Sequence, residues 1–211
     1  PFALDENPTR LTQMTTKALD LLDGQNDKGF FVMIEGSQID WCGHANDIAC
    51  AMGEMDDFAK SIEQAKAYVD KNPDTLLVIT ADHSTGGLTL GAHGQYKWET
   101  DVVKGVKATA GTITKALLES EDLKSVWQKY SDIEFTEANA IKLSEAKKMG
   151  DKALVLAVKD IINHASFTGW TTGGHTAIDV QVFAYGKRAE DFYGSQNNTA
   201  IASKLIDFIK E

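Results

Sequence analysis

One stretch of this chain joins an apolar, β-branched run to a group of polar side chains. Residues Phe30–Ile34 are apolar, a pattern that predicts a buried strand, and Glu35 follows directly. In open α/β sheets, ligands bind where the carboxyl ends of the strands lie. If a helix starts near Ile39, Asp40 and His44 lie one turn apart on the same face. An oxygen and a nitrogen ligand at that spacing can bind a single metal ion.

A second apolar run repeats this arrangement. Residues Thr75–Ala81 predict another buried strand, and Asp82 and His83 follow it at once. Between the two runs, residues 44–69 carry apolar side chains at helical spacing. Strand, helix and strand in this order form a βαβ unit, so the two strands are predicted to be parallel and to end at the same sheet edge. We therefore expect an α/β fold with a mostly parallel sheet flanked by helices.

The middle of the chain is predicted to be helical throughout. Residues 92–165 contain successive amphipathic stretches with polar joints, inside a chain that otherwise alternates strands and helices. We expect a helical insertion or subdomain at 92–165, within a single α/β domain that covers 1–211. A third strand is predicted at Val180–Gly186, and a last amphipathic helix at Asn198–Lys210.

Composition limits the classes of partner. The 211 residues suffice for one domain with a sizeable core, and the formal net charge is -10. A phosphate backbone requires a basic face, so we expect no nucleic-acid partner and no binding to an anionic membrane. No apolar run is long enough to span a bilayer. An acidic protein that handles an anionic substrate needs local positive charge, which bound metal ions can supply.

The two cysteines, Cys42 and Cys50, lie eight residues apart. If both lie along one helix, their spacing argues against a mutual disulfide, so we expect two small buried thiols that do not fix the redox compartment. The chain opens with Pro1 and shows no signal-peptide pattern. We expect it to have been cleaved, trimmed or cut out of a longer protein.

Three of the five histidines stand at strand ends or in a Gly-rich loop. His44 follows Asp40 by four residues, His83 follows an aspartate directly, and His175 follows a Gly-Gly pair. Two histidines match no such pattern, His93 and His164. Together, the strand-end acid and histidine pairs offer enough donors for more than one metal ion. Paired metals suit a displacement at phosphorus, because they hold the attacking and leaving oxygens together.

Three multi-residue segments carry a family resemblance. Residues 35–44 (EGSQIDWCGH), 80–87 (TADHSTGG) and 169–176 (GWTTGGHT) resemble, in this order, the carboxyl-terminal half of bacterial alkaline phosphatases. Weaker matches follow at Ala184–Gly186 and Phe192–Gly194. The resemblance covers almost the whole chain, although the helical middle matches mainly in position and length. It implies a partial alkaline-phosphatase-like fold.

The resemblance also implies roles for five of these residues. Asp40, His44 and His175 match the ligands of a first zinc ion, which binds and activates the attacking water. Asp82 and His83 match ligands of a second zinc ion, which coordinates the nucleophilic hydroxyl.

Glu35 matches a ligand of the family's magnesium site, where a carboxylate suits a hard ion. The nucleophilic hydroxyl, a bridging aspartate and a phosphate-binding arginine belong to the amino-terminal half of the family. No segment here matches that half, and the loop serines Ser37 and Ser84 do not match the nucleophile. The resemblance therefore places no catalytic nucleophile in this chain.

These implications define the expected function. The chain would be the carboxyl-terminal portion of a metal-dependent phosphomonoesterase, periplasmic or secreted, that works through a phospho-enzyme and uses Zn and Mg. Alone it would be inactive, and it would self-associate or bind a partner chain through the surface left by the missing half. Two alternatives are a metal-binding module without turnover, and another hydrolase of the same superfamily such as a sulfatase or phosphodiesterase.

Overall fold

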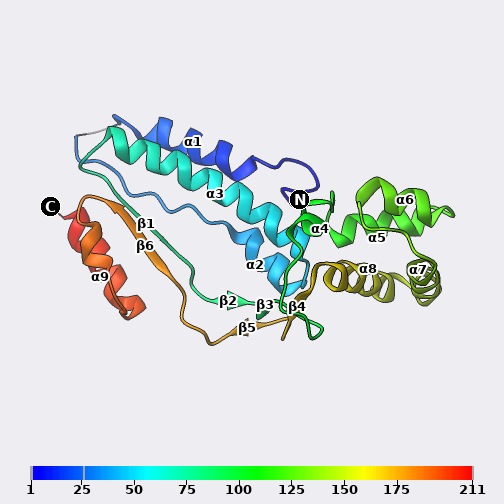
Figure 1. Ribbon diagram of the computed structural model, residues 1–211. Helices are drawn as coiled ribbons and strands as arrows, with labels where there is room; N and C mark the ends of the chain where they lie inside the picture. Colours follow the sequence, from blue (N-terminus) through cyan, green and yellow to red (C-terminus); the bar gives the residue numbers. More distant parts are fainter. Residues whose placement is uncertain (1, 26, 211) are drawn as a thin grey trace.

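The computed structural model describes residues 2–25 and 27–210, so Pro1 lies outside the described part. Long helices and extended strands form one end of the molecule, and a group of helices forms the other (Figure 1). The helices are α1 (Arg10–Leu22), α2 (Ser37–His44), α3 (Ile48–Lys71), α4 (Thr100–Lys104), α5 (Ala110–Glu119), α6 (Leu123–Tyr130), α7 (Glu137–Met149), α8 (Asp151–Ser166) and α9 (Asn198–Ile209). The strands are β1 (Leu76–Thr80), β2 (Ser84–Thr85), β3 (Leu88–Leu90), β4 (Thr168–Trp170), β5 (His175–Thr176) and β6 (Val182–Gly186). A short 3-10 helix covers Ala189–Phe192.

The mixed α/β class is confirmed, but the predicted parallel pairing is wrong for the described strands. β1 pairs with β6, β2 with β5 and β3 with β4, and each pair is antiparallel. The apolar run at 30–35 is extended but belongs to no strand ladder among the described residues. Its side chains alternate, because Phe31 and Met33 are 59% and 80% exposed while their neighbours are half-buried. An apolar run predicts extended backbone, but the partner strand is set by distant residues.

The chain does not form one helix from His44 onwards. Asn46 adopts a left-handed backbone conformation with φ of 53°, and Asp47 begins α3 by accepting a hydrogen bond from the Cys50 N–H at 3.1 Å. The chain therefore turns back between α2 and α3, and the Cα atoms of Cys42 and Cys50 come within 5.5 Å. The two residues form a disulfide. This corrects the expectation of two free thiols, which assumed that a single helix separated them.

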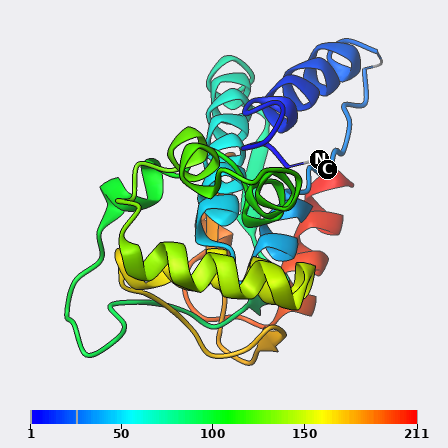
Figure 2. The ribbon, with the colours of Figure 1, turned by 90° about the vertical axis from the view of Figure 1, so that its right-hand side faces the viewer.

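The main hydrophobic core lies among the helices α4 to α8, which face the viewer in Figure 2. Trp127, Leu117 and Leu143 are each 0% exposed there, and the Trp127 indole N–H donates to the Ile133 carbonyl at 2.8 Å. The amphipathic spacing of these helices places their apolar stripes inward, so the group buries its large side chains within itself.

The opposite end of the molecule buries much less. β1, β6 and α9 contain no fully buried residue, and β1 and β6 run side by side toward α9 (Figure 1). The exposed apolar set of this end consists of Phe31, Met33, Phe183, Tyr185, Ile206 and Ile209. No helix within residues 2–25 and 27–210 combines the length and apolar character needed to cross a bilayer.

Candidate metal centre

Asp40 and His44 come from one turn of the short helix α2. The four-residue spacing places both side chains on the same face of the helix. Nε2 of His44 lies 3.4 Å from Oδ2 of Asp40, and both side chains remain partly open to solvent. This geometry agrees with the spacing argument from the sequence.

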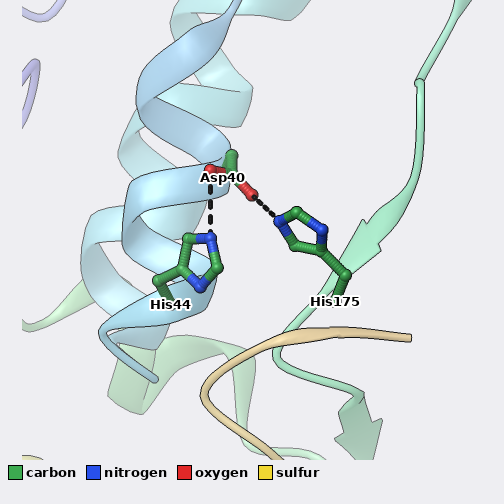
Figure 3. A group of neighbouring side chains, drawn as sticks. All are labelled: Asp40, His44 and His175. Atoms are coloured by element: carbon green, nitrogen blue, oxygen red, sulfur yellow. Dashed lines mark ion pairs between the residues drawn. The ribbon is translucent and has the colours of Figure 1, made fainter.

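His175 reaches the same place from a distant part of the chain. It lies on β5, opposite Thr85 of β2. Its Nε2 lies 3.8 Å from Oδ1 of Asp40, so that Asp40 stands between the two imidazoles (Figure 3). One ligand atom from each of Asp40, His44 and His175 lies within 4.8 Å of the other two. Two nitrogens and one oxygen form a donor set that suits zinc with one open position.

Hydrogen bonds fix the orientation of two of these ligands. Nδ1 of His44 lies 2.7 Å from the Gly173 carbonyl oxygen, a contact that requires a proton on Nδ1. Nε2 of the neutral ring is then an acceptor directed toward Asp40. The Thr85 hydroxyl donates to Oδ1 of Asp40 at 2.5 Å. Outer hydrogen bonds of this kind set the tautomer and orientation of metal ligands.

The turn after β2 ties the His175 loop to the rest of the centre. The Gly86 N–H donates to the Gly174 carbonyl at 2.9 Å, and the Gly86 carbonyl accepts from the Thr171 and Thr172 N–H groups. Gly86 has φ of +82°, and a Cβ there would lie 2.6 Å from the Trp170 ring. Only glycine combines that conformation with this close approach.

The other predicted ligands lie beside the three-residue group or away from it. The His83 ring stacks on the His175 ring with centroids 3.6 Å apart, and its Nε2 lies 3.3 Å from Oδ2 of Asp82. Asp82 is 87% exposed, and neither residue belongs to the three-residue group. Glu35 is exposed, precedes α2 and also lies outside the group.

Sequence reasoning missed two features, one at the centre and one outside it. The first is Thr85, a residue of the second resembling segment, whose hydroxyl also lies 3.2 Å from Nδ1 of His83. The second is the pairing of His93 with His164, whose rings stack at 3.7 Å. Nδ1 of His164 lies 3.3 Å from Oδ1 of Asp160, yet these residues form no convergent ligand group within the described chain. Their separation of 71 positions left no local signal.

Comparison with protein families gives a match along nearly the whole chain. The family model for alkaline phosphatase matches residues 1–210. Alkaline phosphatase 3 of Bacillus subtilis is 42% identical over 200 residues, which cover 93% of this chain and 43% of that protein. Alkaline phosphatase 4 of the same organism is 39% identical over 208 residues, which cover 98% of this chain and 45% of that protein. The chain thus spans less than half the length of these curated relatives.

Solved structures agree with this result. The cold-active alkaline phosphatase from a psychrophilic Shewanella species superposes with a TM-score of 0.96 and 45% identity. That match covers 100% of this chain and 53% of the other. The alkaline phosphatase from the Antarctic bacterium TAB5 gives a TM-score of 0.62 and 27% identity, over 100% of this chain and 44% of the other.

Proposed function

This chain belongs to the alkaline phosphatase family, and from this premise we propose that it is the carboxyl-terminal portion of a metal-dependent phosphomonoesterase. Its substrates would be phosphate monoesters. The single observation that carries the proposal is that His175 converges on the same site as Asp40 and His44, from which it is more than a hundred positions away in the sequence.

We propose that these three residues hold a zinc ion. When bound, zinc supplies a Lewis acid that lowers the pKa of a water molecule and stabilises charge on oxygen. The chain itself contributes the fixed geometry, because the Gly173 carbonyl orients the His44 ring and Thr85 orients the Asp40 carboxylate. Both ligands are thereby prepared before any ion arrives.

The remaining predicted ligands complete the proposal. Asp82 and His83 would bind a second zinc ion, and Glu35 would contribute to a magnesium site. The stacking of His83 on His175 supports the first assignment, because the two rings are direct neighbours, with centroids 3.6 Å apart. A variant of the TAB5 alkaline phosphatase carries bound Mg, which supports magnesium as a metal that this fold can accept.

We propose that these 211 residues alone do not turn over substrate. In the whole enzyme, a hydroxyl would attack phosphorus to form a phospho-enzyme that water then hydrolyses. No segment of this sequence matches the nucleophile-bearing half of the family. The isolated chain would then act as a metal-binding module, which is the second candidate function.

The exposed apolar set would bind either a partner chain or a second copy of this one. Each of these six side chains is at least 40% exposed, and exposed apolar surface on a soluble protein can mark an interaction site or an aggregation liability. We also propose a periplasmic or extracellular location. The Cys42–Cys50 disulfide supports it, because disulfides persist in oxidising compartments.

A zinc titration with a competing chromophoric chelator tests the metal site. The native chain is expected to bind zinc, and His175→Ala is expected to weaken that binding by about tenfold or more. His93→Ala is the matched control, because it removes an exposed imidazole outside the group. Equal zinc affinity of the native chain and His175→Ala would overturn the proposed site.

Hydrolysis of p-nitrophenyl phosphate by the same zinc-loaded sample tests the second part of the proposal. We expect no turnover above the buffer rate. Turnover that His175→Ala abolishes would show that the chain contains a nucleophile of its own and would reject the metal-binding module.

A further inference from the structure

We propose that the Cys42–Cys50 disulfide positions the metal centre by anchoring helix α2, so that Asp40 and His44 keep the geometry required to bind zinc. The inference rests on the proposed zinc-binding role of these residues. It assigns a positioning role to two cysteines that do not belong to the three-residue group.

Helix α2 has low intrinsic stability. It has eight residues, fewer than an isolated helix needs to be stable in water. Its N-cap residue is Gly36, which provides no side-chain hydrogen bond, and Gly43 lies inside the helix. Both features weaken a helix. The position of its two ligands therefore depends on what α2 contacts.

The apolar contacts of α2 are also small. Within α2, only Cys42 and Gly43 are buried, and Trp41 is 62% exposed. Cys42 belongs to a small buried cluster with Cys50 and Ala51, against which the half-buried Phe2 and Met52 pack. The fully buried members are small, so their burial removes less apolar area from water than that of the large side chains in the main core. The disulfide therefore adds a covalent constraint between α2 and α3 where apolar burial is limited.

The disulfide lies behind the ligands, not among them. Cys42 follows Asp40 by two residues and precedes His44 by two, and two residues correspond to about 200° around a helix. The sulfur therefore points away from the face that carries both ligands. The disulfide joins the opposite face of α2 to α3. Helix α3 has 24 residues, and Asp47 caps its first turn.

Asp47 holds the start of α3, the helix to which the disulfide ties α2. Its carboxylate accepts from the Cys50 N–H at 3.1 Å and from the Ala110 N–H at 2.7 Å, so α3 and α5 begin at the same carboxylate. On the ligand side, a Cβ at Gly43 would lie 3.1 Å from Thr85, the residue that donates to Asp40. Helix α2 is thus held between α3 and β2, covalently on one side and by close packing on the other.

The test replaces the bond and measures zinc binding instead of activity. Two variants are needed: Cys42→Ala with Cys50→Ala, and Cys42→Ala with Cys50→Val, which restores apolar volume without the bond. Both are expected to raise the zinc Kd by about tenfold or more, as loss of outer support does at metal sites. The visible absorption of bound Co²⁺ provides a second readout, because its intensity reports the coordination geometry. We expect that band to weaken in both variants.

Leu143→Ala is the matched control. It removes a core side chain that is 0% exposed in the helical group, and so lowers global stability without touching α2. We expect it to leave the zinc Kd and the Co²⁺ spectrum of the folded protein unchanged.

The outcomes separate this inference from the proposed function. If the native chain binds no zinc at the His175 site, the proposed function itself fails. If the native chain binds zinc and both disulfide variants match it within about twofold, the positioning role is wrong. Failure of both variants to fold would also overturn it, because the bond would then be a global requirement rather than a local anchor.

Discussion

The two ends of this molecule differ in how completely they bury their apolar side chains. The helices α4 to α8 and the strands β1 and β6 with helix α9 lie at opposite ends of the molecule (Figure 1). Trp127, Leu117 and Leu143 of the helical group are 0% exposed, whereas Phe183 and Ile209 of the other end are more than half exposed. Both ends carry apolar sequence, so hydrophobicity alone does not distinguish them. The helical group contains its own packing partners, whereas the other end leaves large apolar side chains on its surface. The candidate metal centre lies on elements between them, α2, β2 and β5.

The largest effect is expected from a cavity in the helical group. Trp127→Ala removes a fully buried indole together with its hydrogen bond to the Ile133 carbonyl. It should reduce the free energy of unfolding by about 3–5 kcal/mol. Urea denaturation followed by circular dichroism measures this change. A loss below about 1 kcal/mol would mean that the helical group is not the stable end.

The second largest loss of stability is expected from Asp47, which connects the start of α3 to the start of α5. Asp47→Ala removes the acceptor for the N–H groups of Cys50 and Ala110, which should cost about 2 kcal/mol. Burial raises the pKa of Asp47, so the folded state favours its protonated form and part of the stability it provides is lost as pH rises through that pKa.

The difference in unfolding free energy between native protein and Asp47→Ala should therefore shrink between about pH 4 and pH 8. Urea unfolding at both pH values measures it. A difference that grows with pH would contradict the burial-driven shift.

A smaller effect is expected at the junction itself. Thr85→Val keeps the shape of the side chain but removes the hydroxyl that donates to Asp40. The zinc Kd should rise by about tenfold, which corresponds to about 1.4 kcal/mol. Thr89→Val is the control, because Thr89 lies on an exposed strand. An equal rise of the zinc Kd in the two variants would show that the Thr85 hydroxyl has no specific role in zinc binding.

The smallest effect on stability is expected at the exposed end. Phe183→Ser should change the free energy of unfolding by no more than about 0.5 kcal/mol, because its ring is 57% exposed. The same change should reduce self-association measured by light scattering if this surface binds another chain. A loss of stability as large as that of Trp127→Ala would erase the contrast between the ends.

The sequence carried more information about the site than about the sheet. Asp40 and His44 are related by helical periodicity, and the Gly-Gly-His pattern pointed to His175, so the grouping of these three side chains could be predicted from local spacing and motif. The partner of β1 could not, because antiparallel pairing with β6 depends on residues about a hundred positions away. The disulfide was missed for a local reason. A single left-handed residue, Asn46, reverses the chain, and apolar periodicity continues across it without interruption.

The β2–β5 pair consists of two residues on each strand, and His175 is one of them. Asp40 and His44, by contrast, share a helical turn that a covalent bond ties to α3. The three side chains therefore depend on different kinds of support: a covalent bond for the helical pair, and backbone hydrogen bonds around Gly86 and a two-residue ladder for His175. Reduction of the protein would loosen the first support and leave the second unchanged.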